Sequence, residues 1–261
     1  MIVPLMGVVA ALAAGIHAHR GYSHGTTEVV LVAPDSVLIA ADSKQVYSEF
    51  RRGKRSSSQR DICKAVRIGP YYAFVAGIVS GRNGFNSLKE AQRTYLPGDS
   101  LDDIAESIAE TLPIGIRSVM ETVRAIDPDA FRTYATVPAV TITLAGREND
   151  HPRVIVTEFY LQTGPTGSIE VRSKVHECPG DCAGGNAAYF PGIHDAIDQS
   201  LTNSPLPQGP LAPEEALHLL QLEYAARPDA VGGPPFLLQL SRTGETILQH
   251  GACPADWGDG I

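Results

Sequence analysis

Basic residues are scarce in this sequence, and they form no long cluster. Lys and Arg together number 21 against 29 Asp and Glu, which leaves a formal net charge of −8 over 261 residues. The basic run at 51–55 lies in a polar stretch and is expected to be a solvated loop. Because nucleic-acid binding requires clustered cations opposite the phosphates, this composition argues against a nucleic-acid partner.

The sequence also lacks an apolar run long enough to anchor it in a membrane. Residues 2–16 carry no charge and small residues follow them, which resembles a secretory signal peptide. A spanning helix needs about 20 apolar residues, so we expect no stable membrane anchor. No Lys or Arg precedes the apolar run, so an intracellular propeptide is the alternative. On either interpretation we expect residues 1–25 to be removed. A signal peptide implies an exported protein, periplasmic or secreted, and a propeptide implies a cytoplasmic one.

Cysteine is rare too, with only Cys63, Cys178, Cys182 and Cys253. A metal site needs more ligands than the Cys178/Cys182 pair supplies, so no metal or other cofactor is predicted. In an exported protein these two cysteines can close a small disulfide loop, and three pairings of the four are possible. In a cytosolic protein we expect free thiols instead.

The stretch that organises the chain is a predicted β-hairpin near the N-terminus. Two apolar, β-branched runs at 28–33 and 37–41 flank a Pro-Asp-Ser sequence at 34–36, which has the composition of a tight turn. Thr26 precedes the first strand and Asp42 ends the second. In an antiparallel pair the start of one strand lies beside the end of the other, so we expect Asp42 to lie next to Thr26.

A second hairpin is predicted further along the chain. Residues 47–60 are polar and serine-rich, which indicates a long loop. Residues 62–68 then alternate in strand fashion, a Gly-Pro turn follows, and 71–76 form another strand that ends at Gly77. Lys64 therefore lies near the start of this hairpin.

The remaining chain alternates between helical and strand patterns. Ser100 and Asp103 form a capping-box-like start to a helical pattern that runs to Ile126, and Pro113 is expected to kink this helix or divide it in two. Other helices are predicted at 86–96, 184–200 and 213–226, and strands at 139–145, 154–162, 169–176, 236–241 and 246–250. With 43% hydrophobic residues and no internal repeat, we expect a single α+β domain.

The Gly-Thr-Thr sequence at 25–27, the hairpin, and the Ala-Ala-Asp-Ser sequence at 40–43 together resemble the N-terminus of proteasome β-subunits and related bacterial peptidase subunits. These are N-terminal nucleophile hydrolases, and the resemblance implies their α+β fold, a four-layer αββα sandwich. It implies a leader at 1–25, a hydrolase domain at 26–250 and a C-terminal tail at 251–261. It also implies cleavage before Thr26, because the freed α-amino group then serves as the base for the threonine hydroxyl.

The same resemblance assigns catalytic roles to residues of the two hairpins. Thr26 Oγ is the nucleophile, and Lys64 matches the lysine whose ammonium favours the developing alkoxide. Asp42 keeps Lys64 charged and oriented, and the backbone N–H of Gly77 matches an oxyanion donor. Each residue alone is more often structural than catalytic, but their order on successive hairpins is a specific signal.

Two later segments match the family only in part. Gly185, within an Ala-Gly-Gly-Asn sequence at 183–186, stands where the family usually has a serine near the threonine amine. At 227–233, Asp229 matches a catalytic aspartate of the family, but Gly232 stands where a second serine is expected. A catalytically silent structural or binding protein on the same fold is therefore an alternative to an enzyme.

The resemblance also implies where a substrate side chain lies. Val75 and Val79, two residues before and after Gly77, match the pocket for the residue preceding the scissile bond, and Gln45 and Ile62 match further wall positions. None of them can pair with a charged side chain, so apolar or aromatic residues are expected there. The predicted activity is threonine-type hydrolysis of peptide or other amide bonds, with a small-amide acylase as a further alternative. The resemblance also allows a homo-oligomer.

Overall fold

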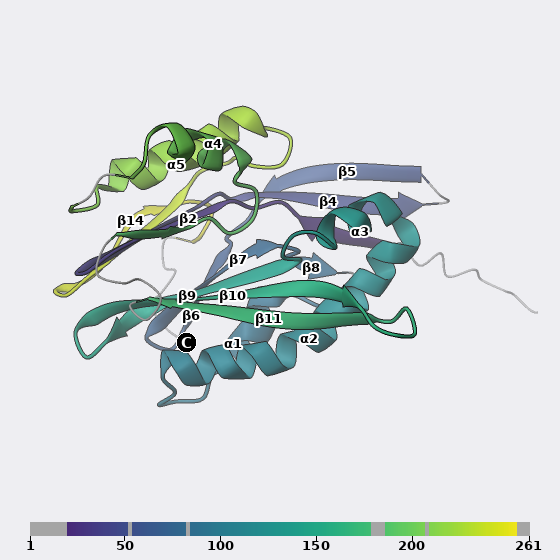
Figure 1. Cartoon of the computed structure of the whole chain (residues 1–261), viewed down its shortest axis with the longest axis horizontal. Coiled ribbons are helices and arrows are strands. Elements are labelled where there is room, and N and C mark those ends of the chain that lie inside the picture. Colours follow the sequence, from purple (N-terminus) through teal and green to yellow (C-terminus); the bar gives the residue numbers. More distant parts are fainter. Residues whose placement is uncertain (1–19, 52–53, 82–83, 179–185, 207–208, 255–261) are drawn as a thin grey trace, which may run out of the picture.

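The computed structural model describes residues 20–51, 54–81, 84–178, 186–206 and 209–254 (Figure 1). These residues form a mixed α+β fold with three antiparallel sheets and five helices. The strands are β1 (Arg20–His24), β2 (Glu28–Ala33), β3 (Ser36–Ala41), β4 (Lys44–Arg51), β5 (Lys54–Asp61), β6 (Ala65–Ile68), β7 (Tyr71–Gly77), β8 (Ser80–Gly81), β9 (Val140–Glu148), β10 (His151–Thr163), β11 (Ile169–Cys178), β12 (Ala187–Tyr189), β13 (Phe236–Ser241) and β14 (Gly244–His250). The helices are α1 (Ser87–Arg93), α2 (Leu101–Ile126), α3 (Pro128–Tyr134), α4 (Asp195–Asn203) and α5 (Pro213–Ala226).

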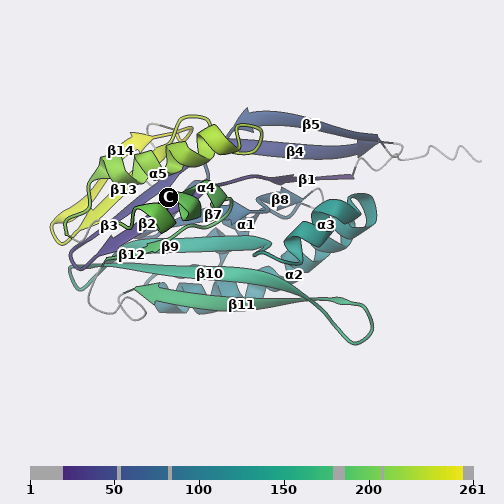
Figure 2. The same ribbon diagram turned by 45° about the horizontal axis from the view of Figure 1, so that its top comes forward.

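Two five-stranded sheets pack against each other, with helices on their outer sides. One has the strand order β12-β2-β3-β13-β14, and α4 and α5 lie over its outer face (Figure 1). The other has the order β11-β10-β9-β7-β6, with α1 and α2 on its outer face. The third sheet, β5-β4-β1-β8, extends toward one end of the molecule (Figure 2). Within the described ranges, no helix is both long and apolar enough to cross a membrane.

The β2–β3 hairpin is buried on both faces because each face meets a different part of the core. Val30 belongs to the cluster between the two five-stranded sheets, which also contains Phe74 of β7. Its neighbour Leu31 points the other way and joins a cluster with Leu219 of α5. This alternation is the period of two expected of a strand, and it explains why both strands are apolar along their whole length.

Several predicted elements are confirmed. β2 pairs with β3 in the expected antiparallel register, and the Asp42 N–H donates to the Thr27 carbonyl at 3.2 Å. β7 ends at Gly77, α5 covers the predicted helix at 213–226, and β13 covers the predicted strand at 236–241. The capping box of Ser100 and Asp103 is present at the start of α2.

The predicted loop at 47–60 is wrong, because most of it belongs to the β4–β5 hairpin. All of β5 is exposed, so this edge strand shows no apolar alternation in the sequence. On its other side β4 pairs with β1, from Arg20↔Phe50 to His24↔Val46. The pairing that makes this segment a strand comes from a distant part of the chain, and local sequence does not encode it.

Two helical predictions are also corrected. Of the two effects expected of Pro113, a kink or a division, the division is wrong, because α2 is one helix whose apolar residues on both sides of Pro113, including Leu112 and Ile116, pack into the same cluster over one sheet. The helix predicted at 184–200 is wrong in its first part, where the described residues form β12 and an irregular segment before α4 begins at Asp195. The short α3 was not predicted.

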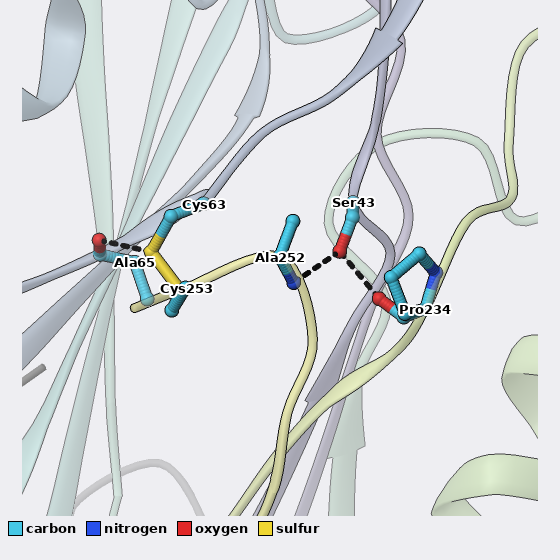
Figure 3. Close-up of a disulfide and its surroundings, with 6 residues drawn as sticks. All are labelled: Ser43, Cys63, Ala65, Pro234, Ala252 and Cys253. Atoms are coloured by element: carbon cyan, nitrogen blue, oxygen red, sulfur yellow. Dashed lines mark hydrogen bonds between the residues drawn. A yellow bond between two sulfur atoms is a disulfide. The ribbon is translucent and has the colours of Figure 1, made fainter. Parts of the chain in front are cut away.

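Residues 251–254, the first part of the predicted tail at 251–261, are attached to the hairpins, and residues 255–261 lie outside the described residues. Cys253 and Cys63 form a disulfide, and the Ala252 N–H donates to Ser43 Oγ at 3.2 Å (Figure 3). Cys178 is disulfide-bonded as well, so free thiols are not found at the described cysteines. Cys182 lies outside the described residues.

Candidate active site

Three buried side chains meet where β1, β2, β3 and the segment before β6 converge. Thr26 lies between β1 and β2, Asp42 directly follows β3, and Lys64 directly precedes β6. Lys64 Nζ donates to Asp42 Oδ1 at 2.6 Å and to the carbonyl oxygen of Gly25 at 2.8 Å. Each of the three residues is at most 2% exposed, so water screens this ion pair very little.

Backbone N–H groups hold the Asp42 carboxylate in a fixed orientation. Oδ1 accepts from Thr27 N at 3.1 Å, and Oδ2 accepts from Lys44 N at 3.1 Å and Gly232 N at 3.2 Å. Burial raises the pKa of Asp42, whereas Lys64 and the N–H groups oppose that rise by stabilising the charged form. These donors fix the carboxylate with one oxygen directed at Lys64.

Lys64 is placed to deliver a positive charge or a proton to the Gly25 carbonyl. Burial lowers its pKa, because desolvation disfavours the ammonium, and the charge of Asp42 and its hydrogen bond to Lys64 oppose this. As an ammonium it polarises the oxygen that it contacts, and the lowered pKa makes proton release easier.

The peptide bond between Gly25 and Thr26 has an unusual environment. Its carbonyl oxygen accepts a hydrogen bond from the Thr26 hydroxyl as well as from Lys64. Gly25 has a φ of +94°, and a Cβ at this position would lie 2.7 Å from the Ala230 carbonyl oxygen. This backbone therefore requires glycine. On the other side of the bond, Ile193 N donates to the Thr26 carbonyl at 3.0 Å.

β1 directly precedes this bond and is a central strand of the third sheet (Figure 2). It pairs with β4 on one side and with β8 on the other. Tyr22 belongs to the hydrophobic cluster beneath α2, and Val79 N donates to the Ser23 carbonyl at 3.0 Å. Sequence reasoning anticipated a removable leader at 1–25 but no strand, and residues 1–19 lie outside the described residues. A strand of mostly small and polar residues gives no apolar pattern to detect.

Glu28 is a further buried group near Lys64 that the sequence analysis did not single out. It opens β2 and is 0% exposed. Its Oε2 accepts from the Thr143 hydroxyl at 2.7 Å, and its Oε1 has no hydrogen-bond partner among the described residues. Burial raises the pKa of Glu28 to about 8, against the opposing effects of Thr143 and Lys64. A charged residue in an otherwise apolar strand was the one signal available.

The four predicted substrate-lining residues divide into two groups. Gln45 Nε2 donates to Ser23 Oγ at 2.7 Å, and Val79 contacts the same residue through its backbone. Val75 is buried in the cluster beneath α2, and Ile62 packs against that cluster. The structure thus brings Gln45 and Val79 to the leader strand, and places Val75 and Ile62 in the adjoining core.

The remaining predicted residues are Gly77, Asp229, Gly232 and Gly185, and of these Gly232 contacts the site directly. Gly77 ends β7 with a φ of +85°, two residues before Val79. The Asp229 carboxylate is exposed and pairs with Arg227 at 3.3 Å. Gly232 contributes its backbone N–H to Asp42. Gly185 lies outside the described residues.

No group of His, Cys, Asp and Glu side chains in the described ranges is arranged to hold a metal ion. The described site holds the Thr26 hydroxyl, the Lys64 side chain, the Asp42 carboxylate and backbone N–H groups. In comparisons with known proteins, no protein-family model and no curated sequence matches the chain.

Proposed function

We propose that this chain is the precursor of a threonine-type N-terminal nucleophile hydrolase that cleaves its own Gly25–Thr26 bond and then hydrolyses peptide or other amide bonds. The observation that carries the proposal is the shared acceptor: the Thr26 hydroxyl and Lys64 Nζ both donate to the Gly25 carbonyl oxygen. A nucleophile and a cation on one buried carbonyl are the groups that an acyl transfer needs.

The cleavage step follows from these groups. Thr26 Oγ adds to the Gly25 carbonyl carbon, and the Lys64 ammonium, held by Asp42 at 2.6 Å, stabilises the oxyanion. The bond from Gly25 C to Thr26 N then breaks as the hydroxyl proton moves to that nitrogen, which leaves an ester on Thr26 Oγ and a free α-amino group. Water hydrolyses the ester and releases Gly25 as a carboxylate. The α-amino group, with a reference pKa of about 7.7 to 8.0, is then available as a base.

The arrangement of layers supports the proposed four-layer αββα sandwich. One hydrophobic cluster lies between the two five-stranded sheets, a second joins one sheet to α2, and a third joins the other sheet to α5. The Cys63–Cys253 disulfide supports export, since disulfides persist in oxidising compartments.

A second candidate function is a binding or structural protein that is never cleaved. The observation in its favour is that β1 is integrated between β4 and β8, with Tyr22 only 1% exposed. Gly232 in place of a serine also favours it, because a hydroxyl is missing from the expected proton relay. A small-amide acylase shares the proposed nucleophile and differs in substrate.

Intact-mass measurement tests the proposal directly. The wild-type protein is expected to contain a chain that begins at Thr26, and Thr26→Ala is expected to retain Gly25. Thr26→Ser is the matched control, because it keeps a hydroxyl and should still be cleaved. A threonine-directed electrophile should add its mass to Thr26 of the mature chain only. A wild-type chain that retains Gly25 after long incubation would instead favour the uncleaved binding protein.

A further inference from the structure

The strand position occupied by β1 is defined by backbone groups on both sides. Tyr22, Ser23 and His24 pair in antiparallel register with residues 46–48 of β4, and Tyr22 and Ser23 pair with β8. If the Gly25–Thr26 bond is cleaved and the leader departs, the facing edges of β4 and β8 lose their partner. An extended peptide that adds as a strand restores those hydrogen bonds. The leader therefore shows where the residues of a substrate would lie.

The Tyr22 side chain lies in a site that is apolar around the ring and has a carboxylate at the hydroxyl end. Its ring is buried in the hydrophobic cluster beneath α2, and its hydroxyl donates to Asp127 Oδ2 at 2.9 Å. Asp127, itself only 7% exposed, lies between α2 and α3. Its Oδ1 accepts from Ala130 N at 3.2 Å, and Arg55 lies 3.3 Å from its Oδ2. The carboxylate is thus held by contacts that do not depend on the leader.

We propose that the Tyr22 site is a substrate subsite that selects tyrosine at the fourth position before the cleaved bond. This inference rests on the proposed function. The hydrogen bond from Tyr22 to Asp127 carries the selection, because phenylalanine fills the same space but leaves a buried carboxylate without its hydroxyl partner. Sites built to bind a hydroxyl reject analogues that lack it far better than apolar pockets separate residues by size. Burial and Asp127 raise the pKa of Tyr22, so its hydroxyl remains a donor throughout the physiological range.

The third position contributes a second, smaller preference. Ser23 is 0% exposed, and its hydroxyl bonds to Ser80 Oγ at 2.7 Å and to Gln45 Nε2 at 2.7 Å. A small hydroxyl residue satisfies both partners, whereas a large side chain has no room there. The favoured substrate therefore has Tyr at the fourth position before the cleaved bond and Ser or another small polar residue at the third.

The test compares three fluorogenic substrates on the mature wild-type protein: acetyl-Tyr-Ser-His-Gly, acetyl-Phe-Ser-His-Gly and acetyl-Ala-Ser-His-Gly, each with an aminocoumarin leaving group. We expect kcat/KM to be about tenfold or more higher for Tyr than for Phe, since a hydrogen bond to a charged acceptor is worth about that factor. Asp127→Ser is the matched variant, because serine still caps α3 but is too short to reach the substrate hydroxyl. In this variant the Tyr to Phe ratio should fall to about one.

The outcomes separate this inference from the proposed function. Hydrolysis of all three substrates with equal kcat/KM for Tyr and Phe would overturn the subsite and leave the hydrolase intact. If the chain starts at Thr26 but turns over none of the three substrates, the binding of two hexapeptides is measured instead. One has the sequence of residues 20–25, and the other has Phe in place of Tyr22. The Tyr peptide is expected to bind at least tenfold more tightly, and equal binding would overturn the subsite. A chain that is never cleaved before Thr26 overturns both proposals.

Discussion

Replacing Glu28 by glutamine should remove a loss of folding stability that grows as the pH rises. Glu28 is fully buried, its Oε1 has no hydrogen-bond partner among the described residues, and burial raises its pKa from 4.5 to about 8. The fold therefore favours the neutral carboxyl. Between these two pH values the folded chain holds a proton that the unfolded chain has released.

The sign and size of the effect follow from proton linkage. Because the folded state binds more protons, the contribution of Glu28 to stability is fully present below about pH 4.5 and is lost as the pH rises through about 8. At about 1.4 kcal/mol per pH unit, the loss between pH 5 and pH 8 is about 3 to 4 kcal/mol. Glutamine does not titrate and its carbonyl can still accept from Thr143, so Glu28→Gln should be free of this loss.

The test is urea unfolding of Glu28→Gln and of its parent, which has Glu28, at pH 5 and at pH 8. Both proteins carry Thr26→Ala so that the chain length is uniform. The free energy of unfolding of Glu28→Gln relative to its parent should increase by about 3 to 4 kcal/mol from pH 5 to pH 8. Glu214→Gln makes the same chemical change at an exposed position on α5 and is the matched control. An equal difference at both pH values would show that Glu28 is already ionised in the folded protein and would refute the reasoning.

Two further predictions concern Lys64 and the disulfide. Lys64→Ala should slow cleavage before Thr26 by about a hundredfold or more, since its ammonium acts on the Gly25 carbonyl oxygen. Intact mass followed over time measures this, and a variant that is cleaved before Thr26 as fast as the wild type would rule out the proposed role. Cys253→Ser opens a disulfide between residues 190 positions apart, and it should lower the free energy of unfolding by about 2 to 5 kcal/mol. Urea unfolding of the variant and of the wild type under oxidising conditions measures this decrease, and equal free energies of unfolding would contradict the prediction.

The elements whose pattern is local could be predicted from the amino-acid sequence. The β2–β3 hairpin, the strand that ends at Gly77 and the helix from Pro213 to Ala226 follow from apolar periodicity and turn or capping residues. The hairpin topology also predicted that Asp42 lies beside the start of β2, because antiparallel pairing joins the ends of consecutive strands.

The features that depend on distant partners could not be predicted from the sequence and became visible in the three-dimensional structure. β4 and β5 are strands because β1 pairs with β4, and the polar sequence of this region gave no sign of it. The hydrogen bond from Tyr22 to Asp127 joins residues 105 positions apart, and the Cys63–Cys253 disulfide was one of three possible pairings. The elevated pKa of Glu28 arises from burial between layers of the fold. Such properties depend on the surroundings of a group in space, and residue spacing along a chain does not specify those surroundings.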